Sequence, residues 1–259
     1  MIIVPLVENL EVDGFQSEKG LSLYIEVQGI KIIFDTGRTD IFMKNATKLG
    51  IDINNIDFFI VSHGHSDHFG GINYLSSKIK ESSRIYVAKE SLDDFDFNFY
   101  GKKRGIGRYK ESKIKSVDFN NILEISENIF LIKTEKKEKS NNFLRDGKID
   151  DFNHEIHLII IENSKVNIIT GCCHSGVLNL LQSVKELFPS KKINSLVGGL
   201  HTRSYIIKPI KLIKLILNLK AYNISKLILG HCTGEKTKAF MKVFLNNISN
   251  IKIGDSYNI

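Results

Sequence analysis

The first ninety residues alternate between short apolar runs and polar turns, a pattern typical of mixed β-sheets with a few helices. Gln28-Gly29 predicts a tight hairpin turn. Asp40 is expected to cap a helix that continues through Leu49 and stops at Gly50. The predicted strands are residues 2–6, 21–27, 31–35, 56–61 and 84–88. A β-hairpin followed by β-α-β indicates a mixed sheet with helices outside it.

The second half repeats this pattern. Asn163-Ser164 is expected to join two strands of a hairpin, and Pro209 falls early in a predicted helix, where it does least harm. In that helix Ile206, Ile210, Ile213 and Leu217 recur at helical spacing, and we interpret them as core rather than as a membrane face. The predicted strands are 156–161, 165–170, 193–197 and 224–229, and the predicted helices are 177–187, 205–219 and 235–245.

Residues 91–151 lack a helical period, although 122–125 and 129–132 have strand-like composition. Long segments without regular structure are usually functional or disordered. We therefore predict one domain over residues 1–259, with an insertion at about 91–151 that partly covers the site. An ordinary surface loop is the alternative.

Composition excludes several classes of protein. Hydrophobic residues make up 42% and charged residues 25% of the chain, which is ordinary for a soluble domain. No apolar run approaches the roughly 18 residues of a membrane helix, and the start lacks the basic region of a signal peptide. Cys172, Cys173 and Cys232 form no disulfide framework. We expect a cytoplasmic protein; the sequence leaves the oligomeric state open.

The net charge of +7 favours an anionic partner. Because the lysines are scattered rather than gathered in one block, a small anionic substrate is a better prediction than nucleic acid.

The densest chemistry lies in His63-Gly64-His65-Ser66-Asp67-His68, directly after an apolar strand. Residues two apart in an extended segment point the same way, so His63 and His65 can bind one ion together. Asp67 and His68 lie beyond the bend at Gly64, which suits a second ion. Imidazole and carboxylate ligands fit zinc, iron or manganese.

Three predicted strands in the second half lead into histidines beside glycine. These are His174, His201 and His231, which follow the strands 165–170, 193–197 and 224–229. Open α/β sheets place their sites at the carboxyl ends of strands. The three histidines are therefore candidates to complete the site that begins at His63.

The spacing H-x-H-x-D-H resembles the signature of the metallo-β-lactamase superfamily, and the strand–histidine units extend this resemblance over nearly the whole chain. It implies an αββα sandwich, two mixed β-sheets with helices outside. Gly171-Cys-Cys-His174, Gly198-Gly-Leu-His201 and His231-Cys-Thr-Gly234 are similar to one subgroup. That subgroup includes metal-dependent hydrolases and the 7,8-dihydropterin-6-methyl-4-(β-D-ribofuranosyl)-aminobenzene-5′-phosphate synthase of methanopterin biosynthesis.

The resemblance also implies residue roles. It assigns Asp35 to orienting the motif loop and His201 to facing the substrate. Cys172 stands where most members have a metal-bridging aspartate, so it is either a thiolate ligand or a buried side chain behind His174. The implied ligands are His63, His65 and His174 for one metal, and Asp67, His68 and His231 for the other.

These features predict a metal-dependent hydrolase, or a pterin-diphosphate transferase, with two divalent ions: zinc, with iron or manganese as alternatives. Asp67 and His201 are the candidate catalytic residues. Phosphate contacts are expected from Arg203 and Lys208, and from Lys102, Lys103 and Arg104 in the insertion. The alternatives are a di-iron redox or ligand-sensing protein, and a nucleic-acid phosphodiesterase, for which an appended basic RNA-binding segment is missing.

Overall fold

The computed structural model describes residues 1–75, 79–93, 95–99, 102–107, 116–134 and 143–259. Within 95–117 it describes the backbone of these residues but not their side chains, so Lys102, Lys103 and Arg104 lie outside the described side chains. The chain forms two compact units that alternate along the sequence. The first unit comprises Met1–Phe119, Lys139–Glu155 and Lys252–Asn258; the second comprises Asn120–Glu138, Ile156–Ile251 and Ile259.

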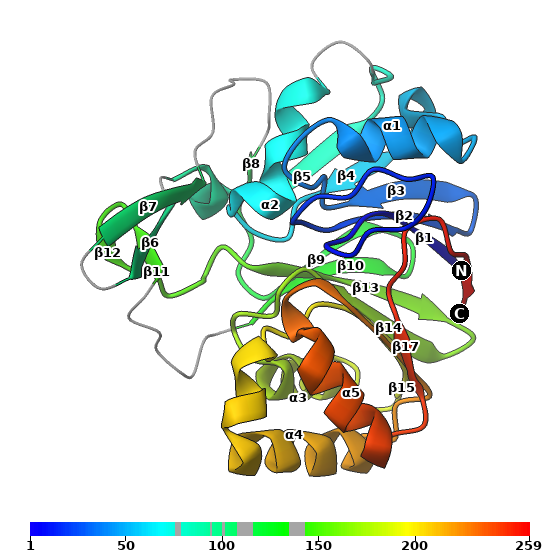
Figure 1. Ribbon diagram of the computed structural model, residues 1–259. Coiled ribbons are helices and arrows are strands. Elements are labelled where there is room, and N and C mark those ends of the chain that lie inside the picture. Colours follow the sequence, from blue (N-terminus) through cyan, green and yellow to red (C-terminus); the bar gives the residue numbers. More distant parts are fainter. Residues whose placement is uncertain (76–78, 94, 100–101, 108–115, 135–142) are drawn as a thin grey trace. The chain divides into compact units, whose positions relative to one another are not determined.

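The first unit is built on a mixed sheet in the order β18-β1-β2-β3-β4-β5-β8 (Figure 1). Its strands are antiparallel from β18 to β3 and parallel from β3 to β8. Parallel pairing places the carboxyl ends of β3 and β4 side by side, with Phe34 opposite Ile60. The bounds are β1 (Ile2–Val7), β2 (Ser22–Val27), β3 (Ile30–Phe34), β4 (Phe58–Ile60), β5 (Arg84–Ala88), β8 (Ser116–Val117) and β18 (Tyr257–Asn258).

Short helices cover this sheet and close its core. The helix α1 (Ile41–Lys48) buries Phe42 and Ala46 against apolar side chains of the strands. Asp40 stands at its N-cap position, but its side chain makes no capping hydrogen bond and pairs with Lys44 at 2.9 Å. The predicted start of the helix at Asp40 is therefore confirmed, but the predicted capping by its side chain was wrong. The other helices here are η1 (Ile53–Asn55), α2 (Ser66–Phe69), η2 (Gly70–Tyr74) and η3 (Lys89–Leu92).

A second, smaller antiparallel sheet belongs to the same unit, in the order β12-β11-β6-β7. It draws its strands from both ends of the segment predicted as an insertion, and β7 lies against α2. The helix with Asp67 and His68 therefore has this sheet beside it. The bounds are β6 (Phe95–Phe99), β7 (Lys102–Gly107), β11 (Phe143–Arg145) and β12 (Lys148–Ile149).

The second unit has its own mixed sheet, in the order β17-β16-β15-β14-β13-β10-β9. Its strands are antiparallel from β9 to β14 and parallel from β14 to β17. Two mixed sheets with helices confirm the predicted fold class. The bounds are β9 (Ile122–Ser126), β10 (Ile129–Lys133), β13 (Ile156–Glu162), β14 (Lys165–Thr170), β15 (Lys192–Gly198), β16 (Lys226–Leu229) and β17 (Ile248–Asn250).

Three helices pack on this sheet: α3 (Val177–Leu187), α4 (Pro209–Ala221) and α5 (Glu235–Phe244) (Figure 1). The predicted helix 205–219 is in fact two elements, because η4 (Arg203–Ile207) ends before Pro209 and α4 begins there. Residues before proline disfavour helical angles, and Lys208 has φ −128° and ψ 67°.

The predicted core stripe of this helix was also wrong. Ile210, Ile213 and Leu217 are 83%, 47% and 61% exposed, and Ile206 is half-buried. The buried face is instead Leu212, Leu215, Ile216 and Leu219. No helix in the described ranges has the length and apolarity that crossing a bilayer requires.

Candidate metal centre

Three imidazoles of the motif gather after β4 in the first unit. The ring of His63 lies 4.6 Å from that of His65 and 4.2 Å from that of His68, centroid to centroid. All three side chains are buried. His63 Nε2 and His65 Nδ1 are 3.1 Å apart, close to the roughly 3.3 Å between two nitrogens on one tetrahedral zinc. The donor set and its spacing therefore fit a divalent metal.

Asp35 anchors this cluster from the end of β3. One carboxylate oxygen, Oδ1, accepts the backbone N–H of Ser62 at 2.7 Å. The other, Oδ2, accepts the Ser62 hydroxyl at 2.8 Å and the His68 Nδ1–H at 2.6 Å. With its proton held on Nδ1, His68 keeps the lone pair of Nε2 for a metal.

Ser62 extends the same chain of hydrogen bonds to His63. Its Oγ donates to Asp35 and lies 2.8 Å from His63 Nδ1, so it accepts the proton of that nitrogen. His63 Nε2 thus carries the lone pair as well. One buried carboxylate therefore sets the tautomer of two predicted ligands.

The backbone at Asp35 is itself unusual, with φ 59°. Aspartate is among the few residues that adopt this left-handed region at modest cost. Such strain persists only where the surroundings enforce it and is common at functional sites. Here the Asp35 N–H donates to the Ile60 carbonyl at 2.8 Å, which ties the ends of β3 and β4 together.

Asp67, a predicted ligand and catalytic residue, lies in α2 and is buried. Its carboxylate pairs with Lys19 at 3.3 Å, and its backbone carbonyl accepts the Leu21 N–H. Lys19 is largely exposed, so this ion pair is weak and readily exchanged for another cation.

Sequence reasoning missed two residues that support the motif loop, Asp150 and His154. His154 Nδ1 accepts the Gly64 N–H at 3.3 Å, and its Nε2 lies 3.1 Å from Asp150 Oδ2. Both side chains are fully buried. Burial alone would raise the pKa of Asp150, but the hydrogen bond and charge interaction with His154, together with the Phe152 N–H and the His65 charge, lower that pKa. The available signal was an Asp and a His four residues apart just before an apolar strand.

Aromatic rings enclose His65. Phe143 stacks on its imidazole at 5.3 Å, and Phe152 meets it edge-on at 5.8 Å. Burial lowers the pKa of His65 to about 3, with the Asp67 carboxylate opposing the shift. At neutral pH the ring is therefore uncharged, the form in which histidine binds metals.

In the second unit, β14, β15 and β16 are adjacent and parallel, so their carboxyl ends share one edge. Thr170 lies opposite Gly198, and Gly198 opposite Leu229. The predicted delivery of three histidine loops to one edge is confirmed within this unit. The rings of His174 and His201 lie 4.3 Å apart.

Left-handed backbone recurs in these loops, at Cys173 (φ 55°), His201 (φ 50°) and His231 (φ 49°). The loops after β15 and β16 hold each other in place. The Leu200 N–H donates to Thr233 Oγ1 at 3.1 Å, and Thr202 Oγ1 donates to the Thr233 carbonyl at 3.3 Å. His201 is exposed while His231 is buried.

Cys172 and Cys232 lie in the same loops. Their sulfur atoms and a ring nitrogen of His201 are within 4.8 Å of one another. Burial would raise the pKa of the Cys232 thiol, but hydrogen bonds with Cys172 and His201 lower it well below its usual value. The two roles predicted for Cys172, thiolate ligand or buried side chain behind His174, stay predictions.

Two of the predicted phosphate contacts, Arg203 and Lys208, follow His201 closely in the sequence. Arg203 begins η4 and packs against Gly234, where an added Cβ would approach the Arg203 Cγ to 2.9 Å. Lys208 precedes α4. Both side chains are exposed.

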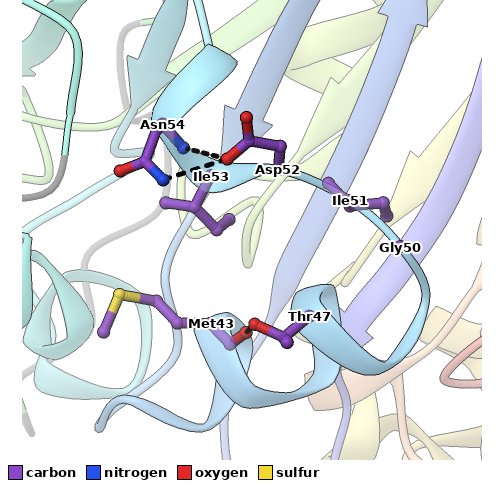
Figure 2. Close-up of a pocket in the computed structure, with 7 residues that line it drawn as sticks. All are labelled: Met43, Thr47, Gly50, Ile51, Asp52, Ile53 and Asn54. Carbon is purple, nitrogen blue, oxygen red and sulfur yellow. Dashed lines mark hydrogen bonds between the residues drawn. The ribbon is translucent and has the colours of Figure 1, made fainter.

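A pocket outside the motif residues lies beside α1 in the first unit (Figure 2). Asp52 accepts two hydrogen bonds from Asn54 there, each of 3.0 Å. The lining residues are Met43, Thr47, Gly50, Ile51, Asp52, Ile53 and Asn54. With one carboxylate and no imidazole or thiol in this lining, it offers little for metal or acid–base chemistry.

Comparison with known proteins agrees with the motif. A family model described as the metallo-beta-lactamase superfamily matches residues 18–165. The 7,8-dihydropterin-6-methyl-4-(beta-D-ribofuranosyl)-aminobenzene-5′-phosphate synthase of Methanocaldococcus jannaschii is 27% identical over 265 residues, covering 93% of this chain and 90% of that protein. The uncharacterized protein MJ0448 of the same organism is 29% identical over 209 residues, covering 76% and 77%.

Among solved structures, the chain is similar to Tm1679, described as a metal-dependent hydrolase of the beta-lactamase superfamily. The TM-score is 0.85 and the sequences are 29% identical, with 100% of this chain and 99% of that one covered.

Proposed function

The chain belongs to the metallo-beta-lactamase superfamily, and on that basis we propose that it is a metal-dependent hydrolase or transferase acting on an anionic, phosphate-bearing small molecule. The observation that carries the proposal is the buried cluster of His63, His65 and His68 with its fixed tautomers. Asp35 and Ser62 hold protons on the far nitrogens of His63 and His68, an arrangement typical of metal-binding histidines.

The proposed cofactors are two divalent ions. The proposed ligands come from the H-x-H-x-D-H motif and from the histidine loops that follow β14 and β16. Zinc is the proposed metal because imidazole ligands suit it and because Cys172 would add a soft thiolate if it binds. The proposed ligands are His63, His65 and His174 for one ion, and Asp67, His68 and His231 for the other.

When bound, such ions lower the pKa of water and stabilise charge that develops on a phosphoryl or carbonyl oxygen. The chain's own groups do the rest. Asp67 orients the nucleophile through its carboxylate. His201 donates a hydrogen bond to the oxygen that gains charge, or protonates the leaving group. Its exposure leaves room for a substrate at this imidazole.

The substrate class follows from charge and from one relative. The M. jannaschii synthase is named for a phosphate-bearing pterin compound. The net charge of +7 on this chain attracts anions, and Arg203 and Lys208 are exposed close in sequence to His201. We propose that these two cations contact the substrate phosphate.

Two reaction types remain within this proposal. Tm1679 is described as a hydrolase, whereas the M. jannaschii relative is a synthase. Hydrolysis uses water as the nucleophile, whereas the transfer that we propose as its alternative uses a carbon nucleophile and requires exclusion of water. Incubating a pterin diphosphate with and without an arylamine distinguishes the two reactions, because transfer needs the arylamine and hydrolysis does not.

The test combines metal analysis with an activity screen. Freshly purified protein should contain about one to two equivalents of transition metal. Metal-loaded protein should then turn over at least one substrate among phosphodiesters, phosphomonoesters, lactones and pterin diphosphates. The double variant His63→Ala/His68→Ala should lose both metal and turnover.

His157→Ala is the matched control. It also removes a buried imidazole, but Thr134 and Thr170 hydroxyls contact both nitrogens of that ring, at 3.2 and 2.9 Å. It should keep its metal. Less than about 0.2 equivalent of metal, even after reconstitution, would refute the proposal. Iron with a visible absorption band would instead favour the di-iron redox alternative.

A further inference from the structure

Two of the three cysteines come together in the second unit, in the loop after β14 and in η5 (His231–Thr233). The sulfur atoms of Cys172 and Cys232 lie within 4.8 Å of each other. Cys172 is buried, whereas Cys232 is partly exposed. One thiol of the pair is therefore accessible to a small reagent, and its neighbour is within reach of it.

The surrounding backbone holds the Cys232 sulfur toward Cys172. This sulfur accepts the His201 N–H at 3.2 Å and donates its proton to the Cys172 carbonyl at 3.6 Å. Gly199 has no side chain and so leaves room for the Cys232 sulfur, because a Cβ at position 199 would lie 2.5 Å from that sulfur. The glycine in the Gly198-Gly-Leu-His201 loop thus has a packing reason that concerns the thiol.

Cys173 provides a contrast. It is adjacent in sequence to Cys172, but its backbone is left-handed (φ 55°) and its side chain packs in the apolar cluster under α3 with Val177 and Leu180. A core thiol of this kind is inert. The structure therefore separates a facing pair from a third thiol directed elsewhere.

We propose that Cys172 and Cys232 form an oxidation site that closes to a disulfide when the protein reacts with hydrogen peroxide. This inference goes beyond the proposed function and does not rest on it. In the first step the Cys232 sulfur attacks one peroxide oxygen, the O–O bond breaks, and water leaves with the thiol proton. Cys232 becomes a sulfenic acid.

In the second step the Cys172 sulfur attacks the sulfur of that sulfenic acid. The S–S bond forms, the S–O bond breaks, and the Cys172 proton leaves with the hydroxyl as a second water. Two thiols are oxidised and one peroxide is reduced. The sulfur atoms, which lie within 4.8 Å of each other, must close to about 2.05 Å for this bond to form.

The linkage would act on the candidate metal centre. Cys232 follows His231 directly, and Cys172 precedes His174 by two residues. Joining the two sulfurs would shift both loops that carry these histidines.

The experiment treats the purified full chain with hydrogen peroxide, both as isolated and after removal of metal with a chelator. Free thiols are then alkylated, and tryptic peptides are identified by mass. The expected product links peptide 166–185, alkylated at Cys173, to peptide 227–236, is two hydrogens lighter than the sum of these two peptides, and is reversed by dithiothreitol. Cys172→Ser and Cys232→Ser should abolish it, whereas Cys173→Ala should form it at the wild-type rate.

Three results would overturn the inference. The first is absence of the linked peptide both with and without metal. The second is a linked peptide that survives Cys172→Ser, since Cys173 would then be the partner. The third is conversion of Cys232 to its sulfinic acid while Cys172 stays alkylatable, which would show that the two sulfurs do not meet.

Discussion

Replacing Asp35 by Asn tests whether one carboxylate sets the metal-binding state of the histidine cluster. The amide has nearly the same shape, so its oxygen can still accept the Ser62 N–H, as Asp35 Oδ1 does at 2.7 Å. Its NH₂ group then faces His68 Nδ1 and the Ser62 hydroxyl, where Oδ2 now accepts two hydrogen bonds. A donor thus replaces an acceptor.

The expected consequence is a change of tautomer at His68. To accept from the new NH₂ group, Nδ1 must lose its proton, and the proton moves to Nε2. A metal must then displace that proton before it can bind. Loss of such a supporting group typically weakens metal binding ~10–100-fold, or about 1.4–2.8 kcal/mol. The lost hydrogen bonds to a buried charge should also cost about 2–4 kcal/mol of folding stability.

Zinc affinity is measured by competition with a chromophoric chelator, and folding by thermal and urea melts. Asp57→Asn is the matched control, because Asp57 accepts the Lys31 N–H at 2.8 Å and pairs with Lys80 near the surface. Ser62→Ala is the graded control: it removes the hydroxyl between Asp35 and His63 but leaves the His68 hydrogen bond intact. Its effect on zinc should be smaller.

Unchanged zinc affinity in a folded Asp35→Asn protein would show that Asp35 does not control the tautomer of His68. An equal loss in Asp57→Asn would point to a general electrostatic effect instead.

Three further predictions concern other residues. His201→Ala should keep its metal and melting temperature but lose ~100-fold or more in turnover, whereas His231→Ala should lose one metal equivalent; equal metal loss in both would make His201 a ligand. His154→Gln should weaken zinc binding ~10-fold by freeing the Gly64 N–H, whereas His154→Asn, whose amide oxygen can replace Nδ1 as the acceptor of that N–H, should weaken it less; unchanged affinities in both would remove His154 from loop positioning. Metal-free protein should lose folding stability as pH falls from 6.5 toward 3, because His65 binds a proton in the unfolded chain but stays neutral in the folded protein, where its pKa is about 3. Urea melts at several pH values should therefore show a shallower dependence of stability on pH for His65→Gln, and identical slopes would contradict this.

Much of the fold could be predicted because local signals agreed with each other. The hairpin at Asn163-Ser164 combines two apolar runs with a turn, and both turn residues have positive φ. The parallel strands leading to His174, His201 and His231 were predictable from repetition of one pattern. The single-domain organisation stays a prediction.

The structural features that sequence patterns failed to predict are those set by tertiary packing. The sequence of α4 is apolar on two faces, so periodicity alone could not choose Leu212 and Ile216 over Ile210 and Leu217. The support of Gly64 by His154 joins positions ninety residues apart. No local pattern encodes such a contact, whereas the H-x-H-x-D-H ligands were visible because they are neighbours in the chain.

The pairing of β18 with β1 has a consequence for how the protein is made. Ile2 pairs with Asn258, so β1 leaves the ribosome long before its partner strand β18 has been synthesised. Until then β1 presents a free edge to other chains, and pairing over such a sequence distance is slow. We expect truncation before residue 252 to yield nascent chains that depend on chaperones and aggregate at an exposed β1 edge, although the strands around the histidine cluster are already complete.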